Sequence, residues 1–177
     1  MRLNYNHLGL YVLAGILSGG LCTWMWEVDP IPNESVKFPL TAVILAVAIL
    51  VAGRYISNTQ FRSGWLSPVI AIVASVIGWQ FAFEFGSAYW ENDLSLIGSG
   101  AIGGICVSIG LALAWKLSQP RFAITIITIH GVLGGLFLVA LDLLAPKTTP
   151  FIGWQGILLL GIGIAVQIDS AKSSAQQ

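Results

Sequence analysis

Two polar side chains one helical turn apart, inside an apolar stretch, are the residues of this chain best placed to do chemistry. Gln80 and Glu84 lie within residues 66–86, and Trp79 precedes them. Residues four apart share one face of a helix, so the amide and the carboxylate would form a polar stripe about one turn deep. A carboxylate among apolar residues is costly unless it meets water, a partner or a cation. We therefore expect Glu84 to face the protein interior beside Trp79.

Further polar and aromatic residues could complete this site. His130 is the most deeply placed ionisable group of its apolar run. It could exchange a proton near neutral pH, or it could be a neutral histidine bonded to a neighbouring helix. The predicted ligand-binding residues are Trp79, Gln80, Glu84, His130, Asp142, Trp154 and Gln155. The alternative is an interfacial aromatic belt, with Glu84 and Asp142 at helix ends among lipid headgroups.

Six apolar runs must position these side chains. Only 9% of the residues are charged and the mean hydropathy is +0.83, which is too little charge to cover a soluble domain. Each run is close to the roughly 20 residues that a helix needs to cross a membrane, and none shows the alternation of barrel strands. We predict an all-α membrane protein, a bundle of six transmembrane helices in one integral domain, 1–177. The predicted helices are Leu8–Trp26, Phe38–Ile56, Leu66–Gly86, Leu94–Trp115, Phe122–Leu144 and Phe151–Ile168.

Basic residues indicate the orientation in the membrane. One side of the predicted bundle would carry Arg2, Arg54, Arg62, Lys116, Arg121 and Lys172, and the other only Lys37 and Lys147. We expect the protein to lie in the plasma (inner) membrane. By the positive-inside rule, both of its termini should then be cytoplasmic. The acids Glu27, Asp29, Glu34, Glu84, Glu91, Asp93 and Asp142 would lie outside, with only Asp169 inside. Such an outer surface would attract cations or a basic partner.

Glycine spacing predicts how the helices pack. Gly15 and Gly19, Gly100 and Gly104, and Gly131 and Gly135 each form a GxxxG pair. Small residues at this spacing let helix backbones approach closely in a membrane. We expect the first, fourth and fifth helices to form a tight centre.

A weak internal repeat is also present. The motif Gly19-Gly20-Leu21-Cys22 recurs as Gly103-Gly104-Ile105-Cys106. Two halves of three helices each would be inverted relative to one another, as in several transporter architectures.

Three functions are compatible with these features. The first is a small-solute or cation transport or binding component with an outward-facing polar and aromatic pocket. The alternative is a non-catalytic structural subunit of a larger membrane complex or homo-oligomer. A membrane-embedded enzyme is third, because the sequence has no evident nucleophile–base pair, nucleotide loop or metal cluster. The expected surroundings are the lipid bilayer, with no nucleic acid and no identifiable cofactor. A transporter should direct Gln80, Glu84 and His130 into one cavity, whereas a scaffold should direct them at partners or headgroups.

Overall fold

The structure, a computed structural model, describes residues 3–31, 33–89, 93–144 and 150–174. Its helices are α1 (Tyr5–Glu27), α2 (Glu34–Ile56), α3 (Leu66–Ala88), α4 (Asp93–Ala114), α5 (Pro120–Leu144) and α6 (Pro150–Ser174). Each contains a stretch that is long and apolar enough to cross a membrane. The predicted six-helix membrane bundle is confirmed.

Local sequence signals set several helix ends. Asn4 precedes α1, and its side-chain oxygen accepts hydrogen bonds from the backbone N–H groups of Asn6 and His7. Asn33 caps α2 in the same way. Pro120 and Pro150 occupy the first positions of α5 and α6, where a missing N–H costs nothing. These caps explain why α1 and α2 begin a few residues before their apolar runs.

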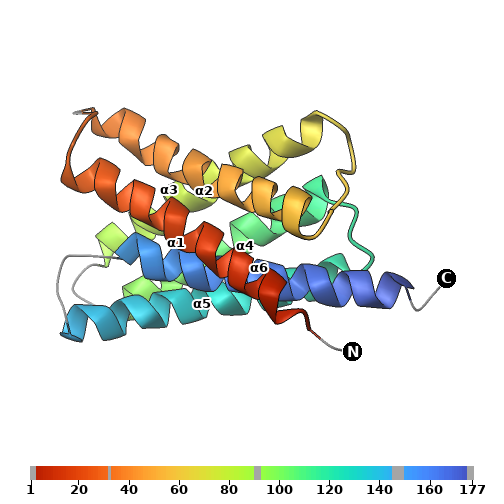
Figure 1. Ribbon diagram of the computed structural model, residues 1–177. Helices are drawn as coiled ribbons and strands as arrows, with labels where there is room; N and C mark the ends of the chain where they lie inside the picture. The colour runs from red at the N-terminus through yellow and green to blue at the C-terminus, as the bar shows by residue number, and fades with distance from the viewer. Residues whose placement is uncertain (1–2, 32, 90–92, 145–149, 175–177) are drawn as a thin grey trace.

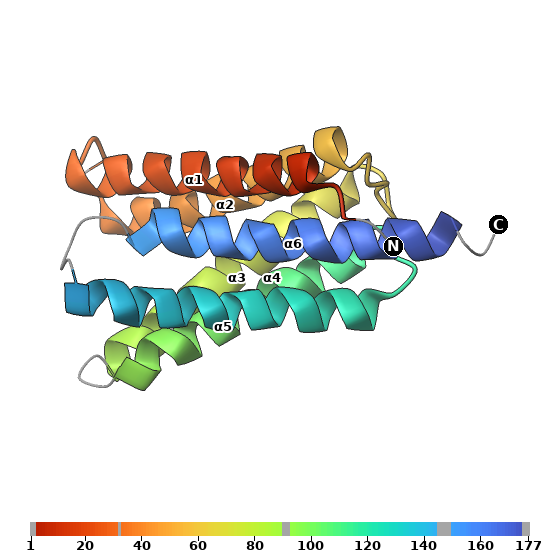
Figure 2. The same cartoon turned by 60° about the horizontal axis from the view of Figure 1, so that its bottom comes forward.

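The helices form a closed ring in chain order. Each helix packs against its neighbours in sequence, α1 also packs against α6, and α2 touches α6. Figure 2 shows α6 lying between α1 and α5, and α6 is the most buried of the six spans. The segments α1–α3 and α4–α6 are therefore side by side, and their relation as inverted halves stays a prediction.

Paired glycines bring α4 and α5 into backbone contact. A Cβ atom added at Gly100 would collide with the carbonyl oxygen of Gly131, and one added at Gly131 would collide with that of Gly100. At Gly135 an added Cβ would lie 2.5 Å from the Leu96 carbonyl oxygen. The GxxxG pairs of these two helices thus define one tight interface, as predicted.

The prediction that α1 joins this centre is wrong. Gly15 and Gly19 face α6 instead, where an added Cβ would lie 2.5 Å from the Gln155 carbonyl oxygen or the Ile152 Cα. The reason is that α6 presents Gly156 beside Gln155, so its backbone is open to close approach at the depth of Gly15. The three GxxxG pairs therefore lie in two separate interfaces, α4–α5 and α1–α6.

Both termini lie at one end of the bundle (Figure 1), which we call the terminal end; the opposite end is the far end. At the terminal end the α2–α3 and α4–α5 connections pair through a single antiparallel bridge between Phe61 and Trp115. The bridge includes Arg62 N to Ala114 O at 2.8 Å and Lys116 N to Gln60 O at 2.9 Å. These bonds explain why Trp115, predicted as the last residue of a helix, lies outside α4.

The last turns of α6 extend past its apolar run to hold the terminal end together. Asp169 accepts hydrogen bonds from the backbone N–H groups of Ser118 at 3.0 Å and Gln119 at 2.7 Å. Gln167 exchanges hydrogen bonds with the backbone of Asn4. Polar contacts of this kind explain why α6 continues beyond the predicted end at Ile168.

Candidate functional site

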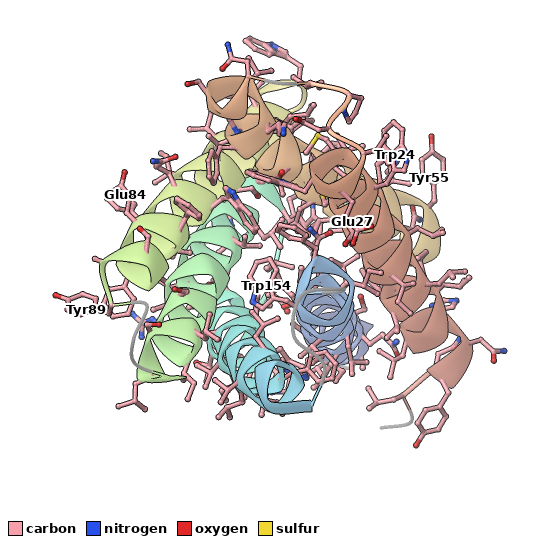
Figure 3. All side chains as sticks on the ribbon, turned by 90° about the vertical axis from the view of Figure 1, so that its left-hand side faces the viewer. Trp24, Glu27, Tyr55, Glu84, Tyr89 and Trp154 are labelled. Carbon is pink, nitrogen blue, oxygen red and sulfur yellow. The ribbon has the colours of Figure 1, made fainter. Side chains whose placement is uncertain are left out.

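Gln80 and Glu84 form the expected pair, but they face away from the bundle. The Gln80 Nε2 atom donates a hydrogen bond of 2.7 Å to Glu84 Oε1, and both side chains are exposed. Figure 3, viewed from the far end, shows Glu84 projecting from the periphery of the bundle. The prediction that Glu84 faces the interior is therefore wrong.

The small residues of α3 explain this orientation. Its buried residues are Ser67, Ala71, Ser75, Gly78, Ala82 and Gly86. They recur at helical spacing and define the face that packs closely on α4, where an added Cβ at Gly78 would lie 2.5 Å from the Cys106 Cβ. Gln80 and Glu84 are each two residues from this stripe, about 200° around the helix, so they lie on the opposite side.

His130 lies on a different helix and contacts a different neighbour. Its Nδ1 atom is 2.9 Å from the carbonyl oxygen of Ile126 in the preceding turn of α5. Because a carbonyl only accepts, Nδ1 carries the proton in this contact. The ring packs against Gly161 of α6, where an added Cβ would lie 2.5 Å from His130 Cβ. The structure therefore separates His130 from Gln80 and Glu84.

Trp79 and Trp154 do meet, inside the bundle toward the far end. Their ring centroids are 6.0 Å apart at an interplanar angle of 62°. Trp154 sits between α4 and α5, because Gly103 and Gly134 leave room for its ring. The contacts continue through neighbouring rings to form an aromatic cluster of Trp26, Phe38, Trp79, Phe83, Phe151 and Trp154. Within the described part of the chain, the buried Trp79 Nε1 has no hydrogen-bond partner.

Gln155 is fully buried and bonds to α1. Its Oε1 atom accepts a hydrogen bond of 2.6 Å from Ser18 Oγ, and its Nε2 lies 3.5 Å from Cys22 Sγ. Cys22 Sγ in turn lies 3.8 Å from the carbonyl oxygen of Thr41 on α2. We call the chain of contacts made by Ser18, Cys22, Thr41 and Gln155 the polar seam. It joins α1, α2 and α6.

The polar seam reaches the far end through residues that are not among the predicted ligand-binding residues. Trp26 Nε1 donates a hydrogen bond of 3.1 Å to Thr41 Oγ1. Lys37 is buried, lies 5.2 Å from the centroid of the Trp26 ring, and forms an ion pair with Asp29. The sequence feature that could have identified these residues is a four-residue spacing. It places Ser18 with Cys22, and Lys37 with Thr41, on one helix face.

One predicted site residue cannot be placed, because the side chain of Asp142 lies outside the described part of the structure. Among the residues that are described, no three His, Cys, Asp or Glu side chains gather as a metal site. The other six residues of the predicted site therefore divide into an exposed pair, a separate histidine, an interior tryptophan pair and a buried glutamine.

The chain has no matching family model, and no curated protein or solved structure is significantly similar to it. Its class therefore follows from its own architecture: a six-helix integral membrane protein.

Proposed function

We propose that this protein is a non-catalytic subunit that docks a partner membrane protein against α3. The observation that carries the proposal is the orientation of Gln80 and Glu84, which are bonded to each other on an exposed helix face. Exposed apolar side chains of the same helix surround the pair. We call the surface made by Val73, Ile77, Gln80, Phe81 and Glu84 the exposed α3 face.

Energetics favour a covered face over one that contacts lipid. Polar and ionisable side chains in transmembrane helices are costly toward hydrocarbon and usually face a partner or a water-filled space. Glu84 lies four residues before the end of α3 at Ala88, about 6 Å of helix rise below it. Gln80 extends the polar stripe one turn deeper. A partner helix that covers both would replace lipid with hydrogen-bonding groups.

The hydrogen bonds of the interior polar groups also support docking of a partner against α3. Gln155 is bonded to Ser18 and Cys22, and Thr41 accepts from Trp26. These side chains are bonded among α1, α2 and α6 and strengthen the bundle itself. By contrast, the Gln80–Glu84 pair has no bond to another helix within the described residues.

Complex size in native membranes tests this function. Native membrane discs are extracted with an amphipathic polymer, and the mass of the protein complex in them is measured. The discs should contain the wild-type chain together with a partner at a fixed stoichiometry. The double variant Gln80→Leu/Glu84→Leu should lose the partner yet keep its unfolding stability, because both side chains are exposed. A matched control, Glu27→Leu at the far end of α1, should keep the partner. Wild-type discs that contain this 18.9 kDa chain alone would refute the proposal.

A second candidate function is a small-solute or cation transport or binding component at the aromatic cluster. The specific observation in its favour is the buried Trp79 Nε1, a donor with no partner in the described structure. A solute with an acceptor group would satisfy that donor, and an organic cation would also be attracted to the tryptophan rings. Candidate solutes that change tryptophan fluorescence in the wild type but not in Trp79→Phe would support this function over docking.

A further inference from the structure

The hydrogen-bonding capacity left on the exposed α3 face is mainly that of an acceptor. Gln80 uses one N–H to bond Glu84 Oε1. This leaves Glu84 Oε2 and Gln80 Oε1 as acceptors, against one remaining amide N–H. The pair also includes the carboxyl group of Glu84. A complementary surface would therefore supply donors and positive charge.

No positive side chain of the described protein neutralises Glu84. Lys37, on the adjacent helix α2, is turned inward to Asp29 and the Trp26 ring. The described Arg and Lys residues other than Lys37 lie at or beside the terminal-end connections and in the last turns of α6, at the opposite end of the bundle. Among the described residues, Glu84 therefore has no basic partner.

The surroundings of the pair restrict what can bring that charge. Ile77 and Phe81 are 47% and 57% exposed beside Gln80 and Glu84, so an occupant must present apolar surface as well as a cation. A helix with one long basic side chain meets both demands, because lysine and arginine place an apolar stem along the membrane and a charged head near its surface. A soluble basic peptide would leave Ile77 and Phe81 uncovered.

We propose, building on the docking function above, that the occupant of the exposed α3 face is a transmembrane helix with a single lysine or arginine. Its basic side chain lies about one turn below the far-end membrane surface, where it pairs with Glu84 and donates a hydrogen bond to the side-chain carbonyl oxygen of Gln80. Apolar residues of the same helix pack on Ile77 and Phe81.

Synthetic helices of defined sequence test this partner chemistry. The purified protein with a donor dye at its C-terminal end is placed in phosphatidylcholine vesicles with acceptor-labelled leucine–alanine transmembrane peptides. Three peptides carry Lys, Leu or Glu one turn from the end that matches the far end. We expect energy transfer to give an apparent Kd about tenfold lower for the Lys peptide than for the Leu peptide. The Glu peptide should bind more weakly than either.

Variants of the protein test whether the preference for the Lys peptide depends on the exposed α3 face. Glu84→Gln should remove most of the Lys preference, Gln80→Leu should reduce it, and Glu27→Gln on α1 should leave it unchanged. Equal binding of the Lys and Leu peptides, or a Lys preference that survives Glu84→Gln, would overturn the inference. Energy transfer between two copies of this chain that Glu84→Gln abolishes would also overturn it, since the occupant would then be a second copy.

The two proposals fail separately. A native complex that depends on Gln80 and Glu84, combined with no Lys preference in the peptide assay, would contradict the basic partner and leave the docking function standing. If native membrane discs contain no partner that depends on Gln80 and Glu84, the docking function itself is contradicted.

Discussion

At the scale of single residues, two glutamines that look alike in sequence occupy opposite environments. Gln80 and Gln155 each follow a tryptophan inside an apolar run. The structure exposes the first and buries the second completely. A single sequence predicts that both glutamines lie at membrane depth, because depth follows from the length and hydropathy of the apolar runs. It does not determine which way each faces, because that depends on the neighbouring helices.

Replacing Gln155 should weaken the bundle. Gln155→Leu removes the acceptor of Ser18 Oγ and the contact to Cys22. The Ser18 hydroxyl would keep only its bond to the Gly15 carbonyl oxygen. We expect a loss of about 1–2 kcal/mol in the free energy of unfolding, measured by steric trapping in bicelles. Gln80→Leu is the matched control and should change it by less than about 0.5 kcal/mol. Equal losses in the two variants would contradict the assigned burial.

Asp169 offers a second test at this scale. Its carboxylate satisfies the backbone N–H groups of Ser118 and Gln119 just before α5. Asp169→Ala should cost about 1–2 kcal/mol, as loss of a helix cap does. Asp169→Asn should cost less, since its amide oxygen can still accept one bond. Thermal unfolding in detergent measures both variants, and an unchanged midpoint for Asp169→Ala would show that the cap contributes nothing.

At the scale of helices, small residues determine which face is buried. Polar stripes suggested that Glu84 points inward, yet α3 turns its Ala, Ser and Gly stripe toward α4. In a membrane, close packing of small residues competes directly with burial of polar ones, because no hydrophobic force separates the faces. The glycine spacing correctly predicted the α4–α5 contact. It could not predict the partner of α1, since a GxxxG pair does not specify what it packs against.

Two adjacent glycines of α1 provide a controlled test of helix packing. A Cβ at Gly19 would lie 2.5 Å from Ile152 Cα, whereas one at Gly20 would meet no atom within 4 Å. We expect Gly19→Ala to lower the free energy of unfolding by about 1–3 kcal/mol through overpacking. Gly20→Ala should be neutral or stabilising by up to about 1 kcal/mol, because alanine favours the helix. A destabilised Gly20→Ala with an unaffected Gly19→Ala would reverse the assigned face of α1.

At the scale of the whole molecule, charge predicts how the bundle sits in the membrane. Both termini share one end (Figure 1), together with Arg62 and Lys116 in the connections and Arg121 in the first turn of α5. The positive-inside rule therefore predicts that the terminal end is cytoplasmic and the far end outside. A reporter that is active only in the cytoplasm should be active when it is fused after Gln177. Activity of a periplasm-specific reporter at that position would reverse the orientation and place Glu84 on the inner side.

The measurement that tests the docking function most directly is photo-crosslinking around the outside of the bundle in native membranes. A photoreactive residue is placed at Ile77 or Phe81 on the exposed α3 face, and for comparison at Leu13 on α1, Ile109 on α4 or Leu133 on α5, which are also exposed. We predict one protein adduct of constant mass from both α3 positions, its loss when Gln80→Leu/Glu84→Leu is added, and only lipid adducts elsewhere. Lipid adducts alone at Ile77 and Phe81, or the same protein adduct from every helix, would contradict a partner docked on α3.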